Sequence, residues 1–271
     1  MAQPYIRFAF DGPIRIYPLV CMHLGARQCD YRFLQEHIKR IADDPLARWV
    51  YMGDGGEVVT KHSKGAVFEQ LLSPQAQLEA VADLLEPVRD KGLFGIRGNH
   101  GHRVYKETGL SFDNTLCYRL GIPFLGVAAM AHFDAGETTY TAYFHHGTES
   151  GTSLRAKITS AEGLARFINA DAIFTAHSHV AMELTPAPLI EADSRNRRLR
   201  TKLRHQYICG CAYDSREGYA EEKGYSPLTP SYISVEFASE GPRQTYTRYA
   251  SDLSYPLKHD YVLKYHLARE E

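Results

Sequence analysis

The sequence predicts an α/β protein, because short apolar runs alternate along the chain with stretches whose apolar residues recur at helical spacing. No internal repeat or low-complexity block interrupts this alternation, and no Ser/Gly-rich linker divides the chain. A length of 271 residues and a hydrophobic content of 44% are enough to bury a sizeable core. We therefore expect one domain over residues 1–271.

Seven apolar runs of strand length predict the β-strands, at residues 14–21, 48–52, 93–96, 139–144, 172–175, 206–209 and 232–237. Three stretches predict helices. The first covers residues 30–41, where Asp30 is placed to cap the N-terminus. The second covers residues 69–89 with a break near Pro74, and the third covers residues 160–168.

The charge balance gives no global attraction to polyanions. A formal net charge of -1 creates no positive field for nucleic acid or an anionic membrane, so a polyanion would have to be held locally. The basic run RNRRLRTKLRH at residues 195–205 is the exception. It is either a solvated surface or a contact with substrate.

Cysteine usage and the N-terminus predict the compartment. Five cysteines, an odd number scattered along a long chain, favour free thiols in a reducing environment. Arg7, Asp11 and Arg15 interrupt the apolar core that a signal peptide needs. No window reaches the roughly 18 apolar residues of a membrane span. We therefore expect a soluble, cytoplasmic protein without a membrane partner.

Five predicted strands end in polar clusters, which read VCMHLG, YMGDGGE, GIRGNHG, YFHHG and FTAHSH. Loops at strand ends are where an α/β sheet gathers its functional site. Taken singly, each cluster has an ordinary explanation, because Gly-Asp and Gly-Asn pairs are typical of turns and a histidine is commonly a surface or core residue. Their joint order along the chain is what indicates a site.

In that order the clusters resemble the calcineurin-like metallophosphoesterases, whose pattern is Asp-x-His, Gly-Asp, Gly-Asn-His, His and Gly-His-x-His. The resemblance covers residues 21–179. It implies a four-layer α/β/β/α sandwich, in which helices flank two mixed β-sheets and the metals lie at one edge. It also implies two divalent transition-metal ions (Mn²⁺, Fe²⁺ or Zn²⁺) and phosphoester hydrolysis by a metal-bound hydroxide.

The resemblance implies a role for each matching residue. Asp54 is expected to bridge the two metals. His100 is expected to be the general acid that protonates the leaving oxygen, or alternatively to orient Asn99. Family examples favour His146 over the adjacent His145 as a ligand. The implied ligands are Cys21, His23 and His179 for the first metal, and Asn99, His177 and one of His145 or His146 for the second.

Cys21 departs from the family, which has Asp at this position. A thiolate ligand would favour Zn²⁺ or Fe²⁺ over Mg²⁺ or Mn²⁺, and Cys-x-His-x-Gly at this place is similar to the RNA lariat debranching enzymes. Alternatively, the first site is weakened and one metal alone is tightly bound, or the protein is an inactive relative. We favour the ligand interpretation because every other ligand position is filled.

Two further positions depart from the family pattern. Gly101 replaces the Glu or Asp that follows Gly-Asn-His, and His102 or Arg103 is expected to take part of that space. Ala176 replaces the glycine of Gly-His-x-His, a mild change if its φ is negative. GNHGHRVYKETG, YFHHGTESG and GYAEEKGYSP also resemble phosphoesterases of tailed-phage and prokaryotic genomes. The last of these, at residues 218–227, is expected beside the C-terminal sheet, as a cleft lining or a surface loop.

The leading hypothesis is a metal-dependent phosphodiesterase that acts on a nucleic acid or nucleotide. Arg27, Arg97, Arg103 and the basic run are candidate phosphate contacts, while the near-neutral net charge equally allows a small phosphodiester. The alternative is a catalytically impaired metal-binding module that captures phosphate-containing ligands.

Overall fold

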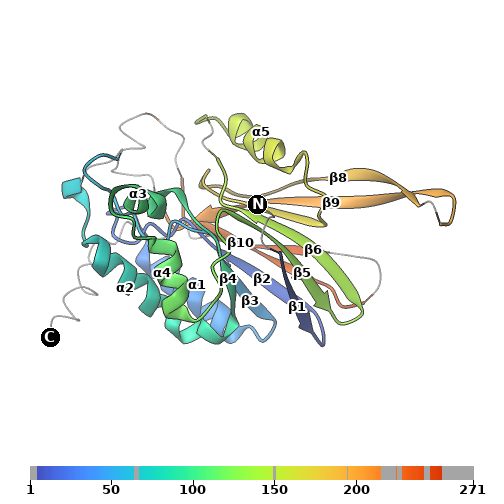
Figure 1. Ribbon diagram of the computed structural model, residues 1–271, viewed down its shortest axis with the longest axis horizontal. Helices are drawn as coiled ribbons and strands as arrows, with labels where there is room; N and C mark the ends of the chain where they lie inside the picture. The colour runs from blue at the N-terminus through green and yellow to red at the C-terminus, as the bar shows by residue number, and fades with distance from the viewer. Residues whose placement is uncertain are drawn as a thin grey trace.

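The computed structural model describes residues 5–63, 67–148, 151–193, 195–214, 224, 228–240 and 245–251. Helices and strands alternate through most of this range, which confirms the predicted α/β class (Figure 1). Residues 218–227, expected beside the C-terminal sheet, lie outside the described residues except for Gly224. The single-domain organisation stays a prediction.

The described strands form one eleven-stranded sheet with two mixed halves. The first half follows the order β1-β5-β6-β7-β9, with β8 beside β9. Its strands are β1 (Tyr5–Phe10), β5 (Ala128–Ala135), β6 (Thr138–His145), β7 (Ala172–Thr175), β8 (Ala181–Asp193) and β9 (Arg198–Cys211). The second half follows the order β10-β2-β3-β4, with β11 beside β10. Its strands are β2 (Ile14–Leu19), β3 (Ala47–Tyr51), β4 (Gly92–Gly95), β10 (Ser231–Phe237) and β11 (Thr245–Ser251).

The two halves face each other across an aromatic core. Phe237 of the second half stacks on Tyr140 of the first with ring centroids 4.7 Å apart, and Phe94 meets Phe144 edge-on at 5.2 Å. The two predicted mixed sheets are therefore present, with one difference. A short ladder, in which Gly210 and Cys211 of β9 pair with β10, joins them into a continuous sheet.

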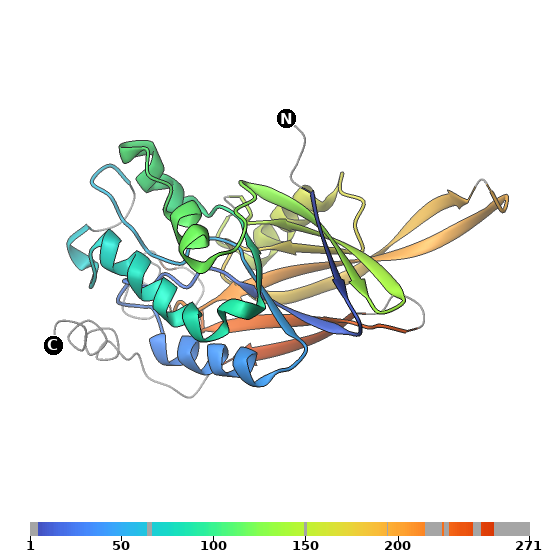
Figure 2. The same ribbon diagram turned by 60° about the horizontal axis from the view of Figure 1, so that its bottom comes forward.

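Helices α1 to α4 gather beside the second half, and α5 lies beside β8 and β9 (Figures 1 and 2). Helix α1 (Tyr31–Asp43) begins as predicted, because the Asp30 carboxylate accepts a hydrogen bond from Phe33 N at 2.9 Å. Helix α2 (Pro74–Leu85) is capped by Ser73 and continues as a 3₁₀ segment, η2 (Glu86–Lys91). The four-layer order that the resemblance implies stays a prediction.

Two helix predictions are corrected, and two helices and a 3₁₀ turn were not predicted. Residues 69–73 precede α2 instead of belonging to it, because Ser73 and Pro74 start the helix. The predicted helix 160–168 is α5 (Leu154–Ala165), capped by Ser153, and only two alanines of α5 are buried, so its apolar pattern is weak. Helices α3 (Asn99–Thr108) and α4 (Phe112–Leu120) were not predicted, nor was the short 3₁₀ turn η1 (Val67–Glu69).

Strands β1, β5, β8 and β11 were also not predicted, and β9 is much longer than the predicted strand 206–209. The basic run 195–205 forms the turn and part of β9 in a ribbon that projects away from α3 (Figure 1). From Cys211 back to Arg198, β9 extends over about 40 Å. Within the described segments, none of the helices is long and apolar enough to cross a membrane.

Candidate metal centre

The predicted ligands follow the carboxyl ends of strands from both halves of the sheet. Backbone hydrogen bonds continue beyond β2 and β3 and fix these segments together, because Cys21 N donates to Gly53 O and His23 N donates to Asp54 O, each at 3.1 Å. The ligand-bearing segments are those of Cys21 and His23 after β2, Asp54 after β3, Asn99 after β4, His146 after β6, and His177 and His179 after β7.

The backbone at these ligands is strained. Seven non-glycine residues in the described part of the chain have positive φ, and five of them are predicted ligands. Each residue held in this left-handed region costs about 1–2 kcal/mol, and such outliers cluster at functional sites. The five are Cys21 (46°), His23 (49°), Asp54 (56°), His177 (66°) and His179 (57°). Ala176 is not among them, so the loss of the family's glycine is tolerated there.

A first group of ligand atoms consists of Cys21, His23 and His179, whose donor atoms all lie within 4.8 Å of one another. His23 Nδ1 donates to the Glu57 carboxylate at 2.7 Å. Because a carboxylate only accepts, the proton sits on Nδ1 and the lone pair of His23 Nε2 faces His179 Nε2 at 3.0 Å. This is the tautomer and orientation that a metal requires of a histidine.

A second group is formed by His146, Asp54 and Asn99. His146 Nδ1 donates to Met52 O at 2.6 Å, and its Nε2 points at Asp54 Oδ2 and Asn99 Oδ1, both 2.9 Å away. Burial opposes a charge on His146, but the Asp54 carboxylate outweighs it and raises the pKa of the imidazole. Asp54 Oδ2 is buried and has no hydrogen-bond partner among the described residues. His146 Nε2, Asp54 Oδ2 and Asn99 Oδ1 thus lie together, and a cation bound there would take the place of a proton on His146. The residues present therefore fit a metal ion.

The charges of the cluster also suit a cation. Burial opposes ionisation of Asp54, but the nearby His146 and His100 hold the pKa of its carboxyl well below the ordinary value. Burial and the neighbouring His146 lower the pKa of His177 to about 4, and burial with His23 holds the pKa of His179 well below its ordinary value. Neutral imidazoles beside a carboxylate are the metal-binding form.

Cys21 belongs to both groups of ligand atoms. Its side chain is fully buried, and its sulfur also lies within 4.8 Å of the ligand atoms of Asp54 and His146. Burial and the Asp54 charge raise the pKa of the Cys21 thiol well above its ordinary value. A thiolate at this place therefore needs a cation to balance it.

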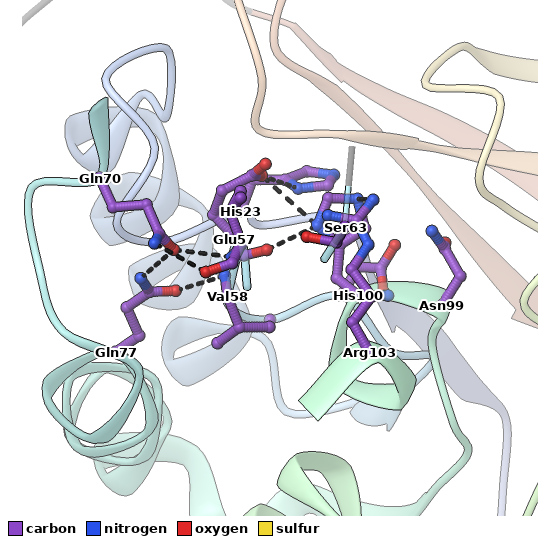
Figure 3. Close-up of polar contacts among 12 residues, drawn as sticks. His23, Glu57, Val58, Ser63, Gln70, Gln77, Asn99, His100 and Arg103 are labelled. Carbon is purple, nitrogen blue, oxygen red and sulfur yellow. Dashed lines mark hydrogen bonds and ion pairs between the residues drawn. The ribbon is translucent and has the colours of Figure 1, made fainter. Parts of the chain in front are cut away.

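Glu57 is a site residue that sequence reasoning missed, although it lies in the YMGDGGE cluster three residues after Asp54. Its carboxylate binds His23, and its backbone carbonyl accepts a hydrogen bond from His100 Nδ1 at 2.7 Å (Figure 3). His100 N also donates to Asp54 Oδ1 at 2.8 Å. Glu57 thus positions both histidines.

His100 is neutral in this arrangement. Its Nδ1 donates to a carbonyl, so Nε2 has a lone pair, which accepts a hydrogen bond from Arg103 Nη2 at 3.1 Å (Figure 3). Burial lowers the pKa of His100, and the charges of Asp54 and Glu57 offset this only in part. The other nitrogen of the guanidinium, Arg103 Nη1, is buried without a hydrogen-bond partner among the described residues.

Two glutamines hold the segment that carries Glu57 (Figure 3). The side chain of Gln77, fully buried on α2, accepts from Val58 N at 2.8 Å and donates to Leu72 O at 2.8 Å. Gln70 accepts from Val59 N at 2.8 Å and returns a hydrogen bond to Val59 O at 3.0 Å. Gln77 of α2 and Gln70, which precedes α2, therefore hold the loop whose Glu57 contacts His23 and His100.

A buried carboxyl lies beside Gly101, the position where the family has an acid. A Cβ at Gly101 would lie 2.4 Å from Asp113 Oδ2, so Asp113 of α4 occupies that space. Tyr51 OH donates to Asp113 at 2.7 Å and Gly98 N donates at 3.2 Å, while burial raises the pKa of Asp113 to about 7. The expected occupants lie elsewhere, because Arg103 contacts His100 and His102 stacks on Tyr105.

The remaining predicted residues divide between the site and the surface. The ring of His177 lies 5.5 Å from that of His146, and His145 accepts a hydrogen bond from Gly147 N. Neither His177 nor His145 belongs to a group of ligand atoms among the described residues. Arg27 is exposed and takes no part in the contacts of the site. Tyr213, which the sequence did not indicate, places its ring 5.6 Å from His23.

Comparison with known proteins gives distant structural likenesses. No family model matches the chain, and no curated protein matches it. Vacuolar protein sorting 29 from Cryptosporidium parvum is 11% identical, with a TM-score of 0.46 over 89% of this chain and 100% of the other. A protein named as a 5′-nucleotidase from Staphylococcus aureus is 13% identical, with a TM-score of 0.49 over 96% of this chain, which spans 58% of that protein. A hypothetical protein from Pyrococcus horikoshii is 8% identical, with a TM-score of 0.45 over 95% and 94%. Function must therefore be inferred from the side chains of this protein alone.

Proposed function

We propose that the protein is a metal-dependent phosphoesterase that hydrolyses a phosphodiester of a nucleotide or nucleic acid. The observation that carries this proposal is the close approach of Asp54 Oδ2 and Asn99 Oδ1 to His146 Nε2, with Asp54 Oδ2 buried and without a hydrogen-bond partner among the described residues. Beside them lies the group of Cys21, His23 and His179. Two groups of acceptors that share Cys21 suit two divalent transition-metal ions, with Asp54 as the bridge and His177 as a further ligand of the second.

Two bound divalent cations would supply Lewis-acid activation of the phosphoryl group and of a water molecule at neutral pH. The residues of the chain would hold these cations in place. The carboxylate of Asp54 and the thiolate of Cys21 would offset the positive charge of the cations, and Glu57 keeps the proton of His23 on Nδ1. The unpartnered Nη1 of Arg103 is free to donate to a phosphate oxygen.

Contact between Arg103 and a phosphate oxygen of the substrate would also allow His100 to act as the general acid. Arg103 now donates to His100 Nε2 and so opposes protonation of that atom. When a phosphate oxygen takes the hydrogen bonds of Arg103, Nε2 becomes free to hold a proton and to pass it to the leaving oxygen. Of the candidate phosphate contacts, Arg103 is thus the one that we propose binds the substrate. Arg27 is exposed and the basic run lies far from the site, so neither supports the proposal.

The test is hydrolysis of bis-p-nitrophenyl phosphate after addition of Mn²⁺, Fe²⁺ or Zn²⁺. We expect His146→Ala to lose at least about a hundredfold in activity, the scale on which loss of a metal ligand or its support acts, and His145→Ala to retain activity within about twofold. These neighbouring histidines form a matched pair. Absence of bound metal and of hydrolysis with every ion would refute the proposal, and so would equal losses in both variants.

The neutral state of His100 favours one alternative function, a binding module that holds phosphate groups without turning them over. The variant His100→Ala distinguishes the phosphoesterase from the binding module. In the binding module, the wild type binds the diester but turns over no faster than this variant. The salt dependence of activity then identifies the substrate class, since a steep loss at moderate salt indicates a polyanion. A cytoplasmic location stays a prediction.

A further inference from the structure

Tyr51 and Asp113 form a buried pair between the loops that follow β3 and β4. Tyr51 ends β3, Asp113 lies on α4, and both residues are at most 1% exposed. The Tyr51 hydroxyl donates to Asp113 Oδ1 at 2.7 Å and accepts a hydrogen bond from Gly55 N at 3.0 Å. Asp113 Oδ2 in turn accepts from Gly98 N at 3.2 Å. Hydrogen bonds through the pair therefore connect the backbone of one loop to the backbone of the other.

Each loop carries a member of the second group of ligand atoms. Asp54 and Asn99 are each adjacent in the chain to a glycine whose amide the pair binds. The backbone pairing of β3 with β4 stops short of these two residues, at the hydrogen bond of 2.8 Å from Ile96 N to Tyr51 O. In the described segments beyond this point, the hydrogen bonds between the two loops involve side chains.

The two loops also touch, so a shift of one loop is transmitted to the other. A Cβ at Gly98 would overlap Asp54 Oδ1, so the absence of a side chain permits this approach. Asp54 Oδ1 accepts a hydrogen bond from His100 N at 2.8 Å. The contacts of Tyr51 and Asp113 are buried, and a buried group that loses its partner is left unsatisfied. Loss of either side chain should therefore let the loops move relative to each other.

We propose that Tyr51 and Asp113 are positioning residues that set the separation of Asp54 and Asn99, and through it the affinity of the protein for the second metal ion. This inference rests on the proposed function and names the residues on which one of its two ions depends. The ion of the first group of ligand atoms should be little affected, because its ligands lie on the loops after β2 and β7.

Binding of Mn²⁺ to the full chain, followed through the EPR signal of the free ion, tests the inference without any assay of activity. Asn99→Ala and His179→Ala identify which binding step belongs to the second group and which to the first. We expect Tyr51→Phe to weaken the step that Asn99→Ala removes by about tenfold or more, and to leave the other step within about twofold of the wild type. Unchanged affinity for both ions, or an equal loss of both, overturns the inference.

Tyr140→Phe is the matched control. Tyr140 of β6 is as fully buried as Tyr51, and its hydroxyl donates to Ala238 O at 2.9 Å. Tyr140 lies five residues before His145, the end of β6, and so away from the ligands. Tyr140→Phe should bind both ions within about twofold of the wild type. If Tyr140→Phe loses the second ion as Tyr51→Phe does, the effect belongs to any buried hydroxyl, and the inference is wrong.

Asp113 provides a second comparison, with thermal unfolding to show that each variant is folded before metal is added. Asp113→Ala should weaken the same step as Tyr51→Phe. Asp113→Asn should restore most of the affinity, because an amide can accept from Gly98 N and donate to the Tyr51 hydroxyl. A loss in Asp113→Asn as large as that in Asp113→Ala contradicts positioning by hydrogen bonds. If Asp113→Ala does not fold, Tyr51→Phe decides.

Hydrolysis of bis-p-nitrophenyl phosphate then distinguishes this inference from the proposed function. If Tyr51→Phe loses the second ion but the wild type hydrolyses nothing, the inference stands and the proposed function fails. If the wild type hydrolyses the diester and Tyr51→Phe binds both ions normally, the proposed function stands and the inference fails. A wild type that binds no metal overturns both.

Discussion

Glu57 offers the sharpest test of how the metal centre is held together. Its carboxylate accepts the Nδ1 proton of His23 at 2.7 Å and lies 3.5 Å from His100 Nδ1, with the Glu57 side chain only 18% exposed. Glu57→Gln keeps the size of the side chain and removes its charge. An amide can still accept from His23, but hydrogen bonds to an ionised group are about twice as strong as neutral ones.

The expected effect is a loss of metal affinity. Removing a carboxylate that orients a metal-bound histidine typically costs 10–100-fold in affinity or activity, equivalent to about 1.4–2.8 kcal/mol. The loss should fall on the ion held by Cys21, His23 and His179, because the Nδ1 proton of His23 is the one that Glu57 fixes. Competition between the protein and a zinc chelator at pH 7.5 measures it directly.

Glu86→Gln is the matched control, since Glu86 lies on η2 with 61% of its side chain exposed and, among the described residues, pairs with Arg89. Thermal unfolding of both variants shows whether each is folded before metal is added. If Glu57→Gln and Glu86→Gln bind Zn²⁺ within about twofold of the wild type, Glu57 does not orient a ligand. The interpretation of its contact with His23 would then be wrong.

Three other predictions concern the same region. Cys21→Asp should shift the preference of the protein from Zn²⁺ toward Mn²⁺, measured by competition between the two ions, because a carboxylate replaces a softer thiolate. Burial raises the pKa of Asp113 to about 7, so the folded state binds a proton more tightly than the unfolded state. The free energy of unfolding should therefore fall as the pH rises from about 4 to 7, by up to about 1.4 kcal/mol per unit more than in Asp113→Asn, a difference visible in denaturant titrations. Trp49→Phe should cost about 1–3 kcal/mol in the same titrations at pH 7, because Val88 O loses the 2.6 Å hydrogen bond from the buried indole.

The parallel strands of the second half were predictable because they are buried on both faces. Residues 14–19 are buried throughout, and their run, apolar except for Arg15, ends where the predicted ligands begin. The Asp30 cap was predictable for a similar reason, since it depends on local sequence alone. The ribbon of β8 and β9 was not, because Ile190 and Leu199 are 74% and 73% exposed and the strand carries a dense basic run.

The candidate ligands were indicated by the order of the polar clusters along the chain, and they remain a prediction, whereas the residues that contact them were not predicted. Helix α3 starts at Gly98 without a side-chain cap and buries only Gly101 and Val104, so nothing in the apolar pattern marks it. Asp113 comes to Gly98 from another helix, through tertiary packing that no local pattern encodes. Glu57 did have a signal, as an acid in a polar cluster three residues after Asp54, and an acid that close to a predicted metal ligand is a candidate partner for a histidine.

The position of the site explains why the two halves of the sheet must stay packed together. Each group of ligand atoms takes residues from both halves, since Cys21 and His23 follow β2 while His179 follows β7, and Asp54 follows β3 while His146 follows β6. In the described segments, the backbone contacts that join the halves are few, namely a two-residue ladder between β9 and β10 and isolated bonds such as that from Ala212 N to Cys21 O at 3.0 Å. The aromatic core between the sheets must therefore set the distance between the ligands, because side-chain packing is resistant to small shifts. A cation bound by both halves would in turn favour the packed state over any opened one, since ligands that bind only the native arrangement stabilise it.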